Sequence, residues 1–507
     1  MRVLFVSPEV YPLAKTGGLA DVSEALPRAL VGAGVDVRVL MPGYASAKAK
    51  VPHARRIADL SGILGVEEAQ LLAARIPGID LPIWLVDAPA LYDREGLYQD
   101  ANGQDWPDNA RRFAFFAHVA AQLAMGRTEV GWMPDVVHAN DWHAGLVPLL
   151  LAQEEEPRPA TVFTMHNLAF QGNFPGHLRG GLGLPENCFS PDGAEYYGQV
   201  SFLKAGVRFA DKLTTVSPTY AREILTPEFG CGFDGLLRAR AGDLTGILNG
   251  ADYAIWDPAN DPFLASNYEP ANLNGKKHCK AALQRELGLP EAPETPVVAF
   301  ISRLTQQKMA DVVARLMPRF AESDLQVVVL SDGDHGLEQM FRAIAQTCPH
   351  KFVVRIGYVE PLAHRMHAGA DMLLAPARFE PCGLSQIYAM RYGTVPLVRA
   401  TGGLADTVID TTRPSISEGR ATGFVFTEPT AEALEQTVHR ACKLYREPLA
   451  WRRLQLSAMK QDFSWIRSAA EYLTLYESVA REPQAAALAR LILPPERTQD
   501  ALEQAAS

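Results

Sequence analysis

The segments KTGGLADV at residues 15–22 and TGGLADTV at residues 401–408 contain the same hexapeptide, TGGLAD. Each copy follows a short apolar run and precedes residues that favour the start of a helix. Paired glycines let the backbone approach a ligand closely, and the free N–H groups of a first helical turn attract an anion. Neither copy matches GxGxxG or GxxxxGK[ST]. Each copy is therefore either a tight strand-to-helix turn or a phosphate contact, and two copies facing a shared cleft favour the phosphate contact.

Short apolar runs that end in small or polar residues recur along the whole chain. In the first half they lie at 3–7, 35–42, 134–141, 161–167, 212–217 and 245–250, and in the second half at 296–302, 325–331, 352–357, 372–376 and 395–398. Stretches with helical spacing separate them, as at residues 19–30 and 109–125. Nearly continuous apolar strands that alternate with helices predict a parallel sheet covered on both faces. We therefore expect two doubly wound, Rossmann-like α/β domains.

The domain division follows from length and from one irregular segment. A chain of 507 residues exceeds what one hydrophobic core usually organises. The segment IWDPANDPF at 255–263 is rich in Pro, Asp and Asn without periodicity, which is typical of a hinge. The predicted division is a first domain at 1–255, a hinge at 256–265, a second domain at 266–462, a helix at 463–480 and an Ala-rich tail of unassigned role at 481–507.

Composition excludes several classes of protein. The 48 basic and 58 acidic residues give a net charge of -10, which argues against a nucleic-acid or acidic-membrane surface. The six cysteines form no CxxC pair, so neither a disulfide framework nor a zinc site is expected. The N-terminal MRVLFVSPEV resembles a buried strand rather than a secretory signal, and no apolar run approaches the roughly 18 residues of a membrane span. A cytoplasmic protein is expected.

Polar side chains concentrate where the predicted strands end, and open parallel sheets bind ligands beyond the carboxyl ends of their strands. The residues at these ends are Ser7, Asp141, His166, Asn167, Ser217, Asn249, Arg303, Gly357 and Glu380. Lys15 precedes the first hexapeptide, and Arg303 and Lys308 follow a strand of the second half. In an acidic protein, these three cations predict the binding of a pyrophosphate in a cleft between the domains.

With these residues assembled, the chain resembles bacterial glycogen synthases and plastid starch synthases from residue 2 to about residue 480. The motifs that carry the resemblance are KTGGLADV (15–22), NDWHA (140–144), TMHNLAFQG (164–172), FLKAG (202–206), TTVSPTYAREI (214–224), LNGAD (248–252), SRLTQQK (302–308) and RFEPCGLSQIYAMRYGTVPLVRATGGLADTV (378–408). The resemblance implies a type B glycosyltransferase (GT-B) fold with a helix at 463–480 that crosses back to the first domain. It also implies transfer of glucose from ADP-glucose to the non-reducing 4-hydroxyl of an α-1,4-glucan in glycogen biosynthesis, with retention of configuration and release of ADP.

The resemblance also implies the site, motif by motif. Diphosphate would contact the cations Lys15, Arg303 and Lys308 and the backbone of Gly17, Gly18, Thr401, Gly402 and Gly403. Polar contacts to the donor would come from Asp21 and Asn249, and the IGY motif would supply Gly357 and an adenine-stacking Tyr358. His166 would lie near the anomeric carbon, and the glucose hydroxyls would be held by Glu380, Cys382, Gly383 and Leu384. The structural alternatives are a strand-end histidine, a helix-capping glutamate and a small buried cysteine.

The expected mechanism depends on the leaving group. Negative charge grows on the departing ADP phosphate and positive charge grows on the sugar, so fixed cations on one side and oxygens on the other stabilise the transition state. No metal or other cofactor is then expected. Asp141 or His166 would orient or deprotonate the acceptor. Retention is open between a covalent carboxylate intermediate and reaction on one face, in which the departing phosphate takes the acceptor proton.

The chain departs from the family pattern at two loops. After Lys308 the family has Gly-x-Asp, whereas this chain has Met309-Ala310-Asp311, so we expect a loop of different shape or mobility. Asp332-Gly333-Asp334 replaces a glycine-rich GxGD turn. Asp-x-Asp also binds the divalent cation of single-domain glycosyltransferases, but a turn is the preferred interpretation here.

Two further functions remain open at this stage. One keeps the fold and changes the donor or acceptor, for example to UDP-glucose or a small sugar. The other is a non-catalytic glucan-binding or regulatory protein, which only Met309 favours, and the retained cations, His166 and Glu380 argue against it.

Overall fold

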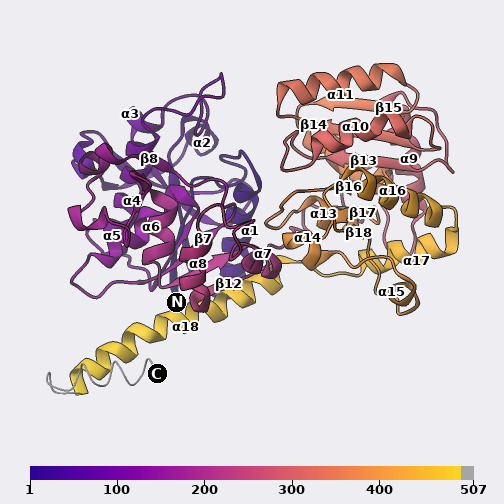
Figure 1. The fold of residues 1–507 in the computed structure, drawn as a ribbon. Coiled ribbons are helices and arrows are strands. Elements are labelled where there is room, and N and C mark those ends of the chain that lie inside the picture. Colours follow the sequence, from indigo (N-terminus) through magenta and orange to yellow (C-terminus); the bar gives the residue numbers. More distant parts are fainter. Residues whose placement is uncertain (493–507) are drawn as a thin grey trace. The chain divides into compact units, whose positions relative to one another are not determined.

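The computed structural model describes residues 1–492, with the side chains of residues 1–480, and the chain forms two compact units (Figure 1). The first unit contains residues 1–216, 224–247 and, among the described residues, 465–492. The second unit contains residues 217–223 and 248–464. Each unit is built around one large, mainly parallel sheet.

The sheet of the first unit has the strand order β12-β11-β7-β6-β1-β2-β5-β4-β3. Its strands are β1 (Arg2–Val6), β2 (Asp36–Pro42), β3 (Arg55–Asp59), β4 (Gln70–Arg75), β5 (Pro82–Asp87), β6 (Val136–Asn140), β7 (Ala160–Met165), β11 (Lys212–Thr215) and β12 (Leu244–Gly246). All six strands predicted in this half are present, and all of them pair in parallel. The sequence prediction missed β3, β4 and β5, which extend one edge and include two antiparallel pairings.

The helices of the first unit flank this sheet. They are α1 (Gly18–Gly32), α2 (Ala45–Lys50), α3 (Pro89–Tyr92), α4 (Asn109–Ala124), α5 (Leu146–Ala152), α6 (Phe202–Phe209), α8 (Asp234–Ala239) and α18 (Trp465–Ile492). A small antiparallel sheet of β8 (Asn173–Pro175), β10 (Gln199–Ser201) and β9 (Glu195–Tyr196) follows β7.

The second unit has an entirely parallel sheet of order β15-β14-β13-β16-β17-β18. Its strands are β13 (Val297–Ile301), β14 (Gln326–Ser331), β15 (Phe352–Ile356), β16 (Met372–Ala375), β17 (Val395–Arg399) and β18 (Phe424–Phe426). Its helices are α7 (Pro218–Glu223), α9 (Asn274–Leu287), α10 (Ala310–Phe320), α11 (His335–Thr347), α12 (Glu360–Gly369), α13 (Ser385–Arg391), α14 (Gly402–Thr407), α15 (Arg413–Ser417), α16 (Ala431–Tyr445) and α17 (Pro448–Met459). The predicted doubly wound architecture is confirmed.

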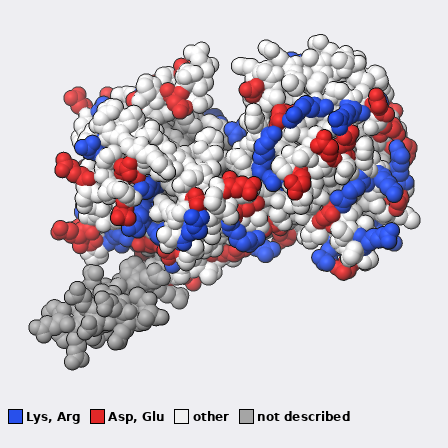
Figure 2. Space-filling model, viewed as in Figure 1, with Lys and Arg blue, Asp and Glu red and all other residues white. Residues whose placement is uncertain are grey.

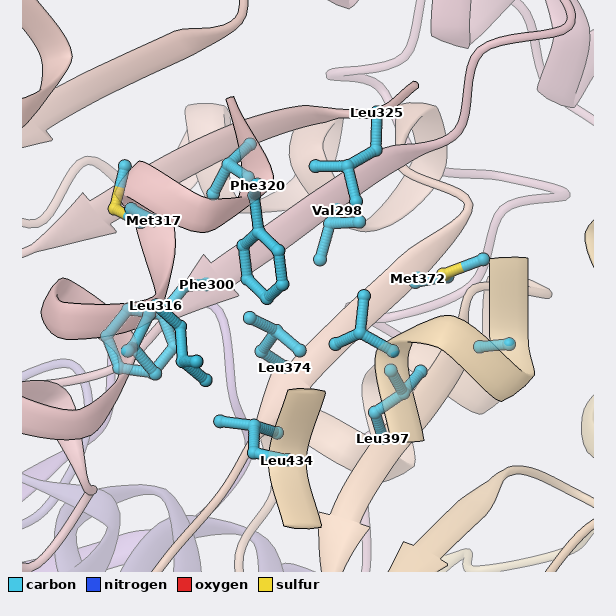
Figure 3. Close-up of a cluster of buried hydrophobic side chains, with 14 of the residues drawn as sticks. Val298, Phe300, Leu316, Met317, Phe320, Leu325, Met372, Leu374, Leu397 and Leu434 are labelled. Atoms are coloured by element: carbon cyan, nitrogen blue, oxygen red, sulfur yellow. The ribbon is translucent and has the colours of Figure 1, made fainter. Parts of the chain in front are cut away.

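Strand β13 shows why its sequence is apolar at every position. Val298 and Phe300 belong to a core cluster that includes Met317 of α10 and Leu434 of α16 (Figure 3). The alternate residues, 297, 299 and 301, pack on the opposite face against residues of α9 and α12. Both faces of the sheet are buried, so no position of the strand faces water.

The order of the strands fixes where ligands can bind. In the first sheet β1 lies between β2 and β6, and in the second sheet β13 lies between β14 and β16. The chain reverses its winding direction at these points, so the loops that leave the two central strands diverge and open a crevice. The loop after β1 carries Lys15 and Gly17, and the loop after β13 carries Arg303 and Lys308.

The predicted hinge at 256–265 belongs instead to the second unit, whose boundary with the first lies between Ile247 and Leu248. Trp256 stacks on His364 and Tyr388, with ring centroids 3.8 and 4.1 Å away. The buried Asp261 carboxylate accepts a hydrogen bond of 2.6 Å from the Tyr392 hydroxyl. The hinge prediction is therefore wrong, because Pro, Asp and Asn here make buried turns rather than a free linker.

Two segments belong to a different unit from the residues that precede them in the sequence. Helix α18 packs on α1 of the first unit, where Tyr476 is buried and its hydroxyl lies 2.6 Å from His138 Nδ1. Residues 217–223, including α7, leave the first sheet after β11 and pack in the second unit, where Ser217 Oγ donates to the Pro381 carbonyl (2.7 Å). Of the tail predicted at 481–507, residues 481–492 continue α18, and residues 493–507 lie outside the described part of the chain.

Acidic and basic side chains are mixed on the face of each unit that Figure 2 shows. Among the described helices, none has the length and apolarity needed to cross a membrane. The mixture of charges agrees with the 48 basic and 58 acidic residues of the chain.

Candidate active site

The crevice of the second unit lies where β13 and β16 end. A cavity of about 40 Å³ opens there, and its walls include Lys308, Glu380, Gly383 and Leu384. Lys308 comes from the loop after β13, and the other three come from the loop after β16. Four predicted site residues therefore meet at the switch point of the second sheet.

Lys308 and Glu380 form an ion pair across this crevice, with both side chains largely shielded from water. A second contact holds the same two loops together, because the Arg378 guanidinium binds both carboxylate oxygens of Asp311 (2.8 and 3.0 Å). Arg303 is exposed, and no residue of the described chain forms an ion pair with it. The loop after β13 thus carries one paired cation and one cation without an ion-pair partner among the described residues.

Met309 occupies the position where the resemblance implies glycine, and its backbone is left-handed, with φ 51° and ψ 30°. For a non-glycine residue this conformation costs roughly 1–2 kcal/mol. The Met309 side chain is fully buried in the core cluster of Figure 3, which offsets that cost. Met309 thus adopts a glycine-like conformation, and Lys308 reaches Glu380. A loop that differs from the family in shape or mobility stays a prediction.

The sugar-binding loop predicted at Cys382 is tightly held. The backbone N–H of Asn249 donates to the Cys382 thiol, and burial raises the pKa of that thiol to about 12, so it stays protonated. Gln386 Nε2 donates to the carbonyls of Cys382 (3.2 Å) and Gly383 (2.9 Å). The Oδ1 atom of Asn249 is buried and accepts no hydrogen bond from the described residues. This oxygen is available to a ligand hydroxyl.

Three strand-end loops of the second unit adjoin one another. Gly357 N donates to the Ser331 carbonyl (2.9 Å), and Ser331 Oγ donates to the Ser302 carbonyl (2.5 Å). Tyr358, the predicted adenine-stacking residue, follows Gly357 and is 51% exposed. The residue before Tyr358 is therefore linked through Ser331 to Ser302, the residue that precedes Arg303.

The Asp332-Gly333-Asp334 loop serves as a turn and a helix cap. Asp334 accepts a hydrogen bond from Leu337 N (2.9 Å) and caps α11, while Leu304 N donates to the Asp332 carbonyl (2.6 Å). Gly333 has φ 143°, and a Cβ there would collide with the Leu304 backbone. The segment thus connects β14 to α11 and caps the helix, and the preference for a turn over a cation site stays a prediction.

The second TGGLAD copy packs against the loop at residues 380–384. Gly402 N donates to the Glu223 carboxylate (3.0 and 3.1 Å), and Thr401 Oγ1 donates to the same group (2.9 Å). Gly403 N donates to the Glu380 carbonyl (3.1 Å). A Cβ at residue 402 would overlap the Glu380 carbonyl, so glycine is required for this close backbone approach.

The first TGGLAD copy binds a carboxylate in the same way. Thr16 N and Thr16 Oγ1 donate to Glu9 (2.6 and 2.5 Å), and Gly17 N lies 3.3 Å from a Glu9 oxygen. The Tyr98 hydroxyl also donates to Glu9 (2.8 Å). Lys15 pairs with Asp21 of the same copy at 2.7 Å.

The two copies differ in what lies opposite their glycines. A Cβ at Gly17 would meet no atom within 4 Å, whereas Cβ atoms at Gly402 and Gly403 would both collide with the backbone of residues 380–382. The first copy therefore borders open space, whereas the second supports the Glu380–Cys382 backbone. That each copy contacts phosphate stays a prediction.

Asp141 and His166 end neighbouring strands of the first sheet. Asp141 has φ 55° and ψ 178°, a region that is essentially restricted to glycine and often marks functional sites. Its Oδ1 accepts a hydrogen bond from His166 N (2.7 Å). Burial raises the pKa of Asp141 to about 7, with a further contribution from the Glu9 carboxylate.

His166 is neutral at physiological pH, because burial lowers its pKa to about 3. Its Nε2 lies 3.0 Å from Asn140 Oδ1, and Asn140 Nδ2 donates to the Val6 carbonyl (3.2 Å). Since the amide nitrogen of Asn140 is used as a donor, the amide oxygen must accept and His166 Nε2 must carry the proton. His166 Nδ1 is then a hydrogen-bond acceptor.

Sequence reasoning missed Glu9, Glu223 and Gln386, which position these loops without belonging to a recognised chemical pattern. Glu9 had a detectable signal, because it is the only carboxylate between β1 and the first hexapeptide. Glu223 had none, since its role depends on α7 packing in the other unit.

Comparison with known proteins identifies the group to which these features belong. The starch synthase catalytic domain family matches residues 2–239, and the glycosyl transferases group 1 family matches residues 286–453. The glycogen synthase of Paramagnetospirillum magneticum is 52% identical over 482 residues, which cover 94% of this chain and 98% of that protein. The glycogen synthase of Burkholderia thailandensis is 51% identical over 480 residues, with 94% and 90% coverage.

Solved structures agree with this relationship. The catalytic domain of starch synthase IV from Arabidopsis thaliana, bound to ADP and acarbose, is 31% identical, with a TM-score of 0.86 over 95% of this chain and 99% of that one. Sucrose-phosphate synthase from Thermosynechococcus elongatus is 17% identical, with a TM-score of 0.58 over 94% of this chain and 98% of that one, and shares the fold.

Proposed function

Because the chain belongs to the glycogen synthase and starch synthase family of GT-B glycosyltransferases, we propose that it elongates α-1,4-glucan with glucose from ADP-glucose. Configuration at the anomeric carbon is retained, ADP is released, and the reaction belongs to glycogen synthesis in the cytoplasm. The observation that carries the proposal is the crevice of the second unit, where the Lys308–Glu380 ion pair lines a cavity at the sheet's switch point.

The donor diphosphate is bound by cations in this proposal. Arg303 is exposed and unpaired, and Lys308 is held at the crevice by Glu380. Lys15 supplies a third cation beside the open space at Gly17. Fixed positive charges stabilise the leaving diphosphate as the glycosidic bond breaks, and this chemistry assigns no role to a metal or other cofactor.

The glucosyl group is held by residues around the Glu380 loop. When the diphosphate takes over Lys308, the Glu380 carboxylate becomes available to accept hydrogen bonds from sugar hydroxyls. The unpartnered Oδ1 of Asn249 supplies a second acceptor, and the Cys382 thiol remains a neutral contact. Gly383 and Leu384 line the same cavity.

The acceptor side belongs to the first unit in this proposal. A neutral His166 with Nδ1 as acceptor orients a hydroxyl or stabilises positive charge at the anomeric carbon without adding a repelling cation. Asp141, with its pKa near 7, contributes to the same environment. The departing phosphate takes the acceptor proton on the same face, which accounts for retention.

The test measures incorporation of radiolabelled glucose into glycogen from ADP-glucose and from UDP-glucose, with and without EDTA. Incorporation from ADP-glucose that persists in EDTA is the expected result. Preference for UDP-glucose would change the donor, and loss in EDTA with recovery on adding Mn²⁺ would favour a metal-assisted mechanism. Glycogen binding without incorporation would indicate a regulatory protein.

A further inference from the structure

A hollow of about 370 Å³ lies on the first unit, apart from the residues discussed above. Its walls come from the β9–β10 hairpin and the start of α8, and include the aromatic residues Tyr196, Tyr197 and Phe233. We infer that this hollow is a secondary binding site for a chain of the α-glucan acceptor. The inference rests on the proposed function for the identity of the polymer.

Tyr197 is presented in a way that its own turn does not favour. Tyr197 and Gly198 form the two-residue turn between β9 and β10, and both have a positive φ, of 49° and 79°. Such two-residue turns prefer Asn-Gly, and a bulky aromatic residue at positive φ is an outlier. Tyr197 is nevertheless 86% exposed, so no burial of its ring offsets the strain. A strained, exposed aromatic side chain points to a role outside the fold itself.

The wall beside Tyr197 is rigid. Tyr196 stacks on Phe233 with a centroid distance of 4.8 Å and an interplanar angle of 18°, and meets Tyr197 edge to face at 4.7 Å. Gly232 has φ 83°, and a Cβ there would collide with the Tyr196 hydroxyl, so glycine is needed to keep this ring in place. The hollow therefore presents preformed aromatic faces.

The charges at the hollow favour a neutral ligand over a phosphorylated one. Lys204 is the basic residue of its lining, and its Nζ already donates to the carbonyls of Pro191 (2.7 Å) and Glu195 (2.5 Å). The Glu195 carboxylate accepts from Gly198 N (2.6 Å) and has no ion-pair partner among the described residues. A free carboxylate repels a nucleotide but accepts hydrogen bonds from hydroxyls. A glucan has apolar ring faces for the aromatic side chains and a rim of hydroxyls for the carboxylate.

The hollow adjoins the loop that follows His166. Leu203 N donates to the Gln171 carbonyl (3.1 Å), and Gln171 Nε2 donates to the Cys231 carbonyl beside Gly232 (2.8 Å). Phe170 of the same loop is 55% exposed. The loop that joins His166 to the hollow therefore offers a second exposed aromatic ring, Phe170, to a polymer whose end reacts near His166.

The test compares Tyr197→Asn with Tyr197→Phe. Asn suits the left-handed turn, so Tyr197→Asn is expected to melt at or above the wild-type temperature while it loses the aromatic face. Its retardation in native gels containing glycogen, without donor, should weaken, and its KM for glycogen should rise by about three- to ten-fold, the range for one aromatic contact. Tyr197→Phe should behave like the wild type, and so should Leu449→Ala, a control that truncates an exposed side chain (79%) of the second unit.

Three results would overturn the inference. They are glycogen binding by Tyr197→Asn equal to that of the wild type, a change in the KM for ADP-glucose in place of the KM for glycogen, and a wild-type chain that glycogen gels do not retard. The gel assay needs no catalysis. A wild-type chain that is retarded, and loses retardation in Tyr197→Asn, but incorporates no glucose would refute the proposed function and leave this site supported.

Discussion

Replacing Met309 with glycine and with alanine tests how the chain keeps the Lys308 loop without the family's glycine. Both variants lose a fully buried side chain, which costs about 2–5 kcal/mol in a core. Only glycine relieves the left-handed backbone, which is worth roughly 1–2 kcal/mol. We therefore expect both variants to be less stable than the wild type, with the alanine variant the less stable of the two by about 1 kcal/mol.

The order of the two variants is the informative result, because alanine buries more surface than glycine and would otherwise be the more stable. Thermal unfolding should give the glycine variant a melting temperature about 2–4 °C above that of the alanine variant in a domain of this size. At 25 °C the kcat of the glycine variant should match that of the wild type, since the Lys308–Glu380 pair does not involve the Met309 side chain. An alanine variant as stable as the glycine variant, or more stable, would refute the left-handed assignment.

Three further predictions concern residues of the predicted site. Asp141→Asn should raise the melting temperature more at pH 8 than at pH 5. The pKa of Asp141 is about 7 in the folded state and about 3.9 in the unfolded state, so the wild type loses roughly 2–4 kcal/mol of stability as the pH rises between these values. An equal gain in melting temperature at both pH values would contradict this. Gly402→Ala should destabilise the protein, because a Cβ there overlaps the Glu380 carbonyl. Gly17→Ala should unfold like the wild type, because residue 17 has φ −158° and open space at its Cβ, but its KM for the donor should rise. Equal stabilities of the two variants in chemical unfolding would show that the two copies are equivalent. Lys15→Ala and Glu380→Ala should each lower kcat by about 10² or more in the incorporation assay, and near-wild-type turnover would remove that residue from the site.

The parallel strands were predictable because their apolar residues are continuous and both sheet faces are covered. Strands β3, β4 and β5 were not predicted, although the residues of β4 and β5 are mostly apolar. Strands β3 and β4 each have a single buried residue, so neither shows the continuous buried run of a central parallel strand. Strand β5 does have such a run, since the five residues after Pro82 are all buried, and its apolar sequence was overlooked. The hinge error has a different origin, since Pro, Asp and Asn mark a turn whether or not the turn is buried.

The site residues that were predictable from the sequence are those in the loops that directly follow strands. Lys308 and Glu380 were each named from their own motifs, and the strand order then brings them into contact. The partners of the two hexapeptides were not predictable, because local sequence specifies a strand, a turn and a helix but not what packs against the turn. Gly17 borders open space and Gly402 meets another backbone, although the six residues are identical.

The shared feature of the two copies also limits how an anion can bind. In each copy a threonine hydroxyl and the N–H of the next glycine point to a glutamate carboxylate, Glu9 or Glu223. A carboxylate at a helix start already satisfies the N–H groups that would otherwise attract phosphate. A diphosphate must then either displace that carboxylate or depend mainly on side-chain cations. Binding to the cations costs less free energy than displacing a carboxylate, because Arg303 has no ion-pair partner in the described chain. Lys15 is a further cation beside the first hexapeptide.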